Sequence, residues 1–199
     1  MNGPSKVGPK PSSGLSVDER AELLRVARRS LEDHFAGAKP GPPEPTTPTL
    51  GEHRGAFVTL HRLRGGNLRG CVGMMRSEES LVQTVARMAV SAAVDDGRFE
   101  PVTGRELPEL RIEISALGPL EPIHPDEVEV GRHGLLISHR GRRGVLLPQV
   151  PVEHDWDRET FLEHTCLKAG LASGAWRGEG VELLGFTAEV FGEERQPTE

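Results

Sequence analysis

Leu68-Arg69-Gly70-Cys71-Val72-Gly73 has the pattern of a β-strand with two glycines inside it. Glycine weakens the interior of a strand unless a bulge, a ligand or another backbone needs the space. Because side chains alternate along a strand, Arg69 and Cys71 are expected on one face, where a guanidinium beside a thiol favours the reactive thiolate. The hexapeptide therefore predicts a small concave site in which Cys71 and Arg69 are the candidate catalytic residues, and Gly70 and Gly73 admit a ligand.

Two alternatives stay open for this site. Free cysteine is among the most buried residue types, so Cys71 can also be a small core residue. His61 precedes the hexapeptide and would serve as a general base only if it touches the thiol. The sequence does not set the strand register, so His61 is a weaker catalytic candidate, with a polar strand residue as the alternative.

The residues around the hexapeptide predict a hairpin, with strands over 56–62 and 68–74 and a turn at Gly65-Gly66-Asn67. Upstream, Ser16 and Glu19 form the capping-box pattern that opens a helix, which continues at helical spacing to Phe35. Between these elements, five prolines make residues 37–50 a connector that is not helical and is expected to run extended over the surface.

Downstream, the patterns predict five further elements in the order helix, strand, hairpin, helix, strand. They are a helix capped by Ser77, a half-buried strand over 110–117, a hairpin of 134–139 and 144–147 around Gly141-Arg142-Arg143, a helix over 158–168 capped by Asp157, and a closing strand over 181–191. Because no βαβ unit recurs, we expect an α+β fold with a mainly antiparallel sheet and flanking helices. The length allows a main lobe with room for a small satellite lobe. We predict a disordered tail over 1–14, a single domain over 15–192 and a flexible C-terminus over 193–199.

Composition excludes several classes of function. The formal net charge of −6 disfavours a nucleic-acid binder with a broad basic surface. No apolar run approaches the ~20 residues that span a bilayer, and no apolar signal-peptide region opens the chain. Two cysteines do not make a disulfide scaffold, so we expect a reducing cytoplasm. With no CxxC pair and no HExxH motif, we predict no metal site.

Two polar residues beyond the hairpin are weaker candidates. Lys168 is the only lysine outside the tail and the connector, which suggests a need for a titratable ammonium, but a charge that complements the end of a helix is the favoured explanation. Gln149 follows a strand end, where its amide would bind a ligand by paired hydrogen bonds or cap the loop. Cys166, Trp156 and Trp176 are expected to be packing residues.

Further motifs surround the hexapeptide in a specific order. They are GAFVTLH at 55–61, DGRFEPV at 96–102, EIS at 113–115, GRHGL at 131–135, LLPQV at 146–150 and CLKAGL at 166–171. In this order and spacing they resemble the AMMECR family, whose prokaryotic members are called AmmeMemoRadiSam system protein A. The resemblance covers about residues 16–192, and the family's typical hexapeptide has isoleucine where this chain has Val72. It implies a Memo-like protein and a radical SAM protein as partners, and it implies no particular reaction or cofactor.

Two functions follow as hypotheses. In the first, the chain is an enzyme or enzyme subunit that acts with these partners through a cleft at 68–73, on a central strand. In the second, it is a non-catalytic adaptor or ligand-binding module that uses the same cleft, with Arg69 as an interface anchor. No acid lies between Leu60 and Ser77, so Arg69 must meet a distant acid such as Glu113, backbone carbonyls or an anionic group of a small-molecule or protein ligand. If the partner is an anionic group of a ligand, the Arg69→Lys protein is expected to fold and to lose function.

Overall fold

The hairpin forms at the predicted place in the computed structural model, which describes residues 14–194. Strands β1 (Ala56–Arg62) and β2 (Leu68–Met74) pair antiparallel. Gly65 and Gly66 in the connecting turn have φ of +80° and +66°, a conformation that glycine adopts readily. The register shifts between Leu60 and His61, so that Arg69 is the extra residue of a β-bulge.

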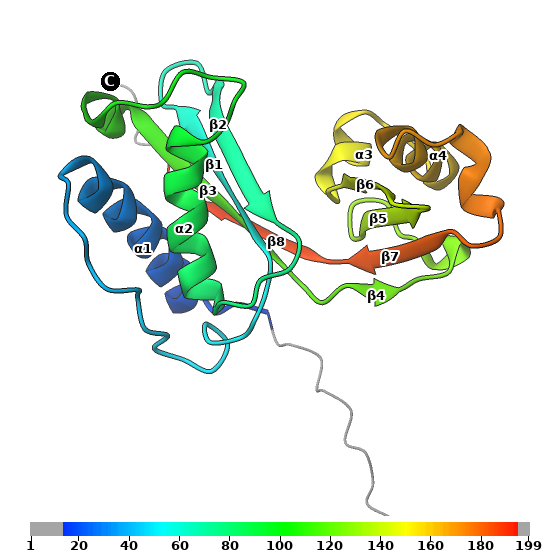
Figure 1. Ribbon diagram of the computed structural model, residues 1–199, viewed down its shortest axis with the longest axis horizontal. Coiled ribbons are helices and arrows are strands. Elements are labelled where there is room, and N and C mark those ends of the chain that lie inside the picture. The colour runs from blue at the N-terminus through cyan, green and yellow to red at the C-terminus, as the bar shows by residue number, and fades with distance from the viewer. Residues whose placement is uncertain (1–13, 195–199) are drawn as a thin grey trace, which may run out of the picture.

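This hairpin belongs to the first of two antiparallel sheets, in the order β2-β1-β3-β8. Strands β3 (Leu110–Leu117) and β8 (Ala188–Gly192) complete it. Helices α1 (Val17–Phe35) and α2 (Leu81–Val94) pack on one face of it, as Figure 1 shows. The alternation of the strands sends their apolar side chains to this helical face and the intervening side chains to the other face. We call the latter the open face; it carries Thr59, His61, Cys71, Arg111 and Glu113.

The first turns of α1 and α2 are capped in different ways. The capping box of Ser16 and Glu19 opens α1 as predicted. Helix α2, however, has Ser80 rather than Ser77 at its N-cap, so that prediction is wrong. The reason is that carbonyls of the proline-rich connector, those of Leu50 and Glu52, accept the first N–H groups of α2. A side-chain cap is therefore not required there.

The second lobe has a four-stranded sheet of its own. Its strand order is β4-β7-β5-β6, and helix α4 (Arg158–Lys168) packs on it. The strands are β4 (Glu121–Pro122), β5 (Gly134–His139), β6 (Arg142–Leu146) and β7 (Glu182–Phe186). Short helices complete the structure: α3 (Gln149–Glu153) and the 3₁₀ turns η1 (Gly104–Glu109), η2 (Pro125–Glu127) and η3 (Ser173–Arg177).

Two predicted boundaries in this part of the chain are wrong. The turn of the second hairpin is Arg140-Gly141, where φ is +48° and +81°, and Arg142 and Arg143 lie in β6. The predicted closing strand divides at Thr187 into β7 and β8, one in each sheet. The division occurs because the chain leaves one sheet and enters the other at this point.

The two lobes are joined by a two-stranded ribbon, visible at the centre of Figure 1. It consists of the β3–β4 and β7–β8 connections, where the Gly118 N–H donates to the Thr187 carbonyl at 2.8 Å. All strand pairs are antiparallel, and helices flank both sheets, which confirms the α+β class. None of the helices within residues 14–194 combines the length and apolar character needed to cross a membrane.

The predictions for the chain ends are tested only in part. Residues 1–13 of the predicted tail and residues 195–199 lie outside the described residues. Glu193, the first residue of the predicted flexible C-terminus, accepts the Ile112 N–H at 2.9 Å and pairs with Arg28. Flexibility of residues 193–199 stays a prediction.

Candidate functional site

Cys71 lies half-buried on the open face, on an edge strand rather than the central strand that the sequence predicted. Its register partner is Thr59 on β1. The Thr59 hydroxyl donates a hydrogen bond to the Cys71 sulfur, with Oγ1 and Sγ 3.3 Å apart. The thiol is thus neither a core residue without polar contacts nor an exposed loop tip.

The loop after α2 covers the outer edge of β2 at Cys71. The Cys71 N–H donates to Oδ2 of Asp96 at 2.8 Å, and Nη2 of Arg98 is 3.4 Å from the Cys71 carbonyl oxygen. Arg98 also donates to both carboxylate oxygens of Asp96, at 2.9 and 2.7 Å. These bonds satisfy main-chain groups that an edge strand would otherwise expose.

Charge pairing within this loop holds Arg98 next to the main chain of Cys71. The pKa of Asp96 lies far below its usual range, mainly because Arg98 donates to the carboxylate and also because the Cys71 N–H does. The pKa of Arg98 is raised, chiefly by these hydrogen bonds to Asp96. The cation nearest to the Cys71 main chain is therefore Arg98, held in place by Asp96.

Arg69 meets internal partners of two kinds that the sequence left open, a distant acid and a backbone carbonyl. Its Nε and Nη2 donate to the two carboxylate oxygens of Glu106 at 3.0 and 3.3 Å, and Nη1 donates to the Glu100 carbonyl at 2.9 Å. The side chain is only 8% exposed. The distant acid is thus Glu106 and not Glu113, and the guanidinium is engaged by the protein itself.

The glycines of the hexapeptide also serve internal packing. A Cβ atom on Gly70 would lie 2.0 Å from the Ala92 carbonyl oxygen of α2, and one on Gly73 would lie 2.2 Å from the Phe57 ring. These positions make room for the helix and the ring. The ligand-binding role predicted for both glycines lacks the open space it requires.

His61 does not form a pair with Cys71. The bulge shifts it to face Leu68, while Thr59 occupies the position across from the thiol. The imidazole Nδ1 is 3.3 Å from the Gly66 carbonyl oxygen, and Nε2 is 3.8 Å from a carboxylate oxygen of Glu113. The imidazole is therefore oriented by these groups on the open face and is not placed as a base for Cys71.

Gln149 and Lys168 lie in the second lobe, apart from the first sheet. Gln149 is the first residue of α3 and is half-buried, and its Oε1 has no hydrogen-bond partner within the described chain. Lys168 is an exposed residue in the last turn of α4, where its charge complements the helix dipole. Cys166 is fully buried, and burial raises the pKa of its thiol. The structure does not bring these residues together with Cys71.

Sequence reasoning missed Thr59, Asp96, Arg98 and Glu106 as parts of this region. The alternation of the first strand contained a signal for Thr59, since it places this residue on the face of Cys71 once the register is known. Asp96 and Arg98 belong to the DGRFEPV motif, and the opposite charges two residues apart in it are the signal that could have pointed to this loop. Among residues 14–194, no three His, Cys, Asp or Glu side chains are grouped so as to hold a metal ion.

The Glu106 carboxylate gives a pH-dependent prediction. Arg69, and then the Thr103 N–H, donate to it and lower its pKa from 4.5 to about 2. This stabilisation is present above about pH 4.5 and is lost as the pH falls towards 2, for a total of about 3 kcal/mol. In urea unfolding, the stability difference between wild type and Glu106→Gln should therefore be constant above pH 5 and shrink below pH 4. A difference that stays constant down to pH 2 would contradict this assignment.

Relatives of this chain are known both from sequence and from solved structures. A protein of Thermococcus gammatolerans is 44% identical over 188 residues, covering 89% of this chain and 92% of its own length. Protein MJ0810 of Methanocaldococcus jannaschii is 42% identical over 193 residues, covering 92% and 94% of the two chains. The crystal structure of the uncharacterized protein PH0010 from Pyrococcus horikoshii matches with a TM-score of 0.78 and 43% identity, over 86% of this chain and 90% of that one. The AMMECR1 family model matches residues 24–191, and the chain therefore belongs to the AMMECR1 family.

Proposed function

We propose that the protein is a thiol-dependent enzyme or enzyme subunit in which Cys71 is the nucleophile. The observation that carries the proposal is the hydrogen bond from Thr59 to the Cys71 sulfur, with the Arg98 guanidinium held beside the same residue, its Nη2 3.4 Å from the Cys71 carbonyl oxygen. A hydroxyl donor and a positive charge both favour the thiolate, which is the attacking form of cysteine. The half-buried position on the open face leaves the sulfur in reach of an electrophile.

The arrangement activates the thiol by stabilising its negative charge. Arginine does not act as a base, and His61 is engaged elsewhere on the sheet, so no side chain is placed to remove the proton directly. Asp96 holds the Arg98 guanidinium through two hydrogen bonds, which fixes the charge before a substrate arrives. In this proposal Cys71 is the catalytic residue, Thr59 and Arg98 stabilise it, and Asp96 is a positioning residue.

The partners and the cellular compartment are part of the same proposal. The resemblance of the motifs to AmmeMemoRadiSam proteins supports a Memo-like protein and a radical SAM protein as partners. Both cysteines are free thiols, which favours a reducing cytoplasm. A product of one of these partners would then supply the electrophile that Cys71 attacks.

Alkylation with iodoacetamide tests the nucleophile, and the chain contains its own reference thiol. Cys71 should react at neutral pH in the folded protein, whereas the fully buried Cys166 should react only after unfolding. Thr59→Val removes the donor while keeping the side-chain shape and should slow alkylation of Cys71 by about tenfold, as expected for loss of a charge-assisted hydrogen bond. Arg98→Gln should slow it to a similar extent.

Peptide mapping by mass spectrometry measures the rate at each cysteine separately. Arg87→Gln is the matched control, because this exposed arginine pairs with Glu79 away from the thiol and should leave the rate unchanged. A Cys71 that reacts no faster than Cys166 in the folded protein would overturn the nucleophile assignment.

A non-catalytic adaptor is the second candidate, and the apolar exposure on the open face favours it. Leu68, at the start of β2, is 38% exposed, and Val190, on the opposite edge strand β8, is 46% exposed on the same face as Cys71. Residues of this type supply contact area at protein interfaces. For an adaptor, folded Cys71→Ala should still capture the Memo-like protein in a pull-down and support full pathway activity, whereas for an enzyme it should capture the partner and lose activity.

A further inference from the structure

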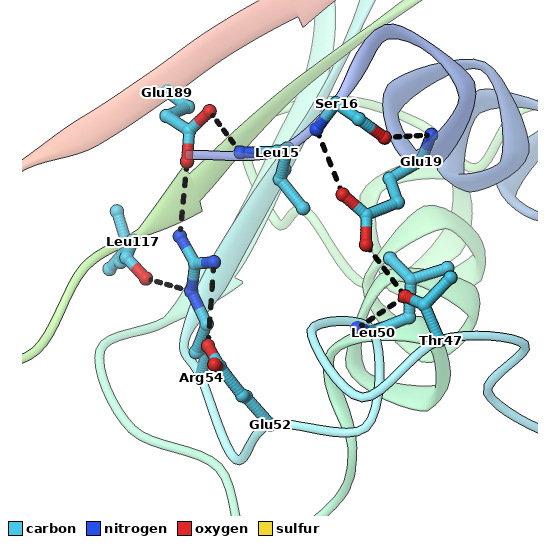
Figure 2. Close-up of polar contacts among 9 residues, drawn as sticks. All are labelled: Leu15, Ser16, Glu19, Thr47, Leu50, Glu52, Arg54, Leu117 and Glu189. Carbon is cyan, nitrogen blue, oxygen red and sulfur yellow. Dashed lines mark hydrogen bonds and ion pairs between the residues drawn. The ribbon is translucent and has the colours of Figure 1, made fainter. Parts of the chain in front are cut away.

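Arg54 has a buried guanidinium at the end of the first sheet where the ribbon leaves for the second lobe. Figure 2 shows this side chain between Leu117 and Glu189. Its Nε donates to the Leu117 carbonyl at 2.7 Å, and its Nη2 lies 3.5 Å from Oε1 of Glu189. The side chain is 7% exposed, and Nη1 has only Glu52 nearby, with the Oε2 atom at 3.7 Å. Arg54 thus contacts both strands of the ribbon, β3 through Leu117 and β8 through Glu189.

Glu189 connects the same point to the beginning of α1. Its Oε2 accepts the Leu15 N–H at 2.9 Å and the Arg20 guanidinium at 3.0 Å. Leu15 directly precedes the Ser16 cap, so the start of α1 is fastened to β8, as Figure 2 also shows. Three segments that are far apart in the sequence therefore meet at one carboxylate.

Immediately beyond this cluster the two strands of the ribbon are paired and closely packed, so they move together. Gly118 follows Leu117 and donates to the Thr187 carbonyl, and a Cβ on Gly118 would lie 2.4 Å from the Thr187 hydroxyl. The extensive packing between helices and strands falls within one lobe or the other. Among the ion pairs of residues 14–194, none joins residues 118–187 to the rest of the chain. The direction of the ribbon therefore sets how the second lobe is oriented.

We infer that Arg54 and Glu189 form an ionic lock that fixes the direction of the ribbon and, through it, the orientation of the second lobe relative to the first. Buried ionic groups add little net stability over apolar residues of the same size, but they accept only a narrow geometry. Here that geometry includes a carbonyl on one ribbon strand and a carboxylate on the other. Without the lock, the ribbon can change direction where it leaves the first sheet, while the cores of both lobes remain intact.

Residual dipolar couplings of backbone amides test this inference, since they report the orientation of each lobe in one aligned sample. In the wild type, a single alignment tensor should fit the amides of both lobes. In Arg54→Met, which keeps an unbranched side chain and removes its donors, that shared tensor should be lost while each lobe still fits a tensor of its own. The shared tensor should also be lost in Glu189→Gln. This variant tests the inference if Arg54→Met does not fold.

Arg87→Met is the matched control, because it removes an exposed arginine of the first lobe that pairs only with Glu79 among the acids. It should keep the shared tensor. The inference is overturned if the folded lock variants keep one tensor for both lobes, or if the wild type already requires two.

Discussion

Replacing Arg69 with alanine is expected to lower the free energy of unfolding by about 3 kcal/mol, since removal of one partner of a buried ion pair leaves the other uncompensated. The loss would remove two hydrogen bonds to Glu106 and one to the Glu100 carbonyl. Arg69→Lys should lose most of the same stability, because an ammonium does not reproduce the planar fork of donors. Urea unfolding at pH 7 measures both variants.

Arg62→Ala is the control for this prediction. Arg62 also pairs with Glu106, at 3.5 Å, but its side chain is 45% exposed, so we expect a loss of at most about 1 kcal/mol. An Arg69→Lys protein with wild-type stability and lost partner binding would restore the interface role predicted from the sequence. A large loss of stability in Arg69→Lys, with binding retained in the folded fraction, supports the internal role.

Gly70→Ala is expected to be at least as damaging, at about 3 kcal/mol or more, because it forces the first sheet away from α2. The added Cβ would lie 2.0 Å from the Ala92 carbonyl oxygen, and this is a backbone atom that no side-chain rotation can move aside. Residues around Ala92 are buried in the core of this lobe. Thermal and urea unfolding should both show the loss.

Gly41→Ala controls for the general effect of changing a glycine. No atom lies within 4 Å of a Cβ at Gly41, so its stability should change by no more than about 0.5 kcal/mol. If Gly70→Ala and Gly41→Ala unfold at the same urea concentration, the close approach of α2 to β2 is not what requires glycine at position 70.

The local patterns of the sequence determined much of the fold. Alternation predicted β1, β2 and β3 at their observed bounds, and helical spacing with a capping box predicted α1. These patterns are informative because propensity, capping and the burial of one face act over a few neighbouring residues. The α+β class followed from the order of such elements, without any knowledge of which strands pair.

The candidate site was predictable only in its central residue. The sequence identified Cys71 as a strand residue on a hairpin, but not which groups surround it. Arg69, at the bulge, pairs with Glu106, and the fold of the loop after α2 places Arg98 beside the Cys71 main chain. A bulge depends on how two strands align, and this is not encoded in the alternation of either strand alone.

By itself, then, the sequence determined the positions of most helices and strands, the class of the fold and the thiol that merits a test. The tertiary structure alone decided which distant groups meet: Glu106 is 37 residues from Arg69, and Glu189 is 135 residues from Arg54. It also decided that the closing strand divides between two sheets and so produces two lobes. The physical reason is that pairing of buried charges and sharing of strands depend on the whole chain packing together, whereas strand and helix patterns depend on near neighbours.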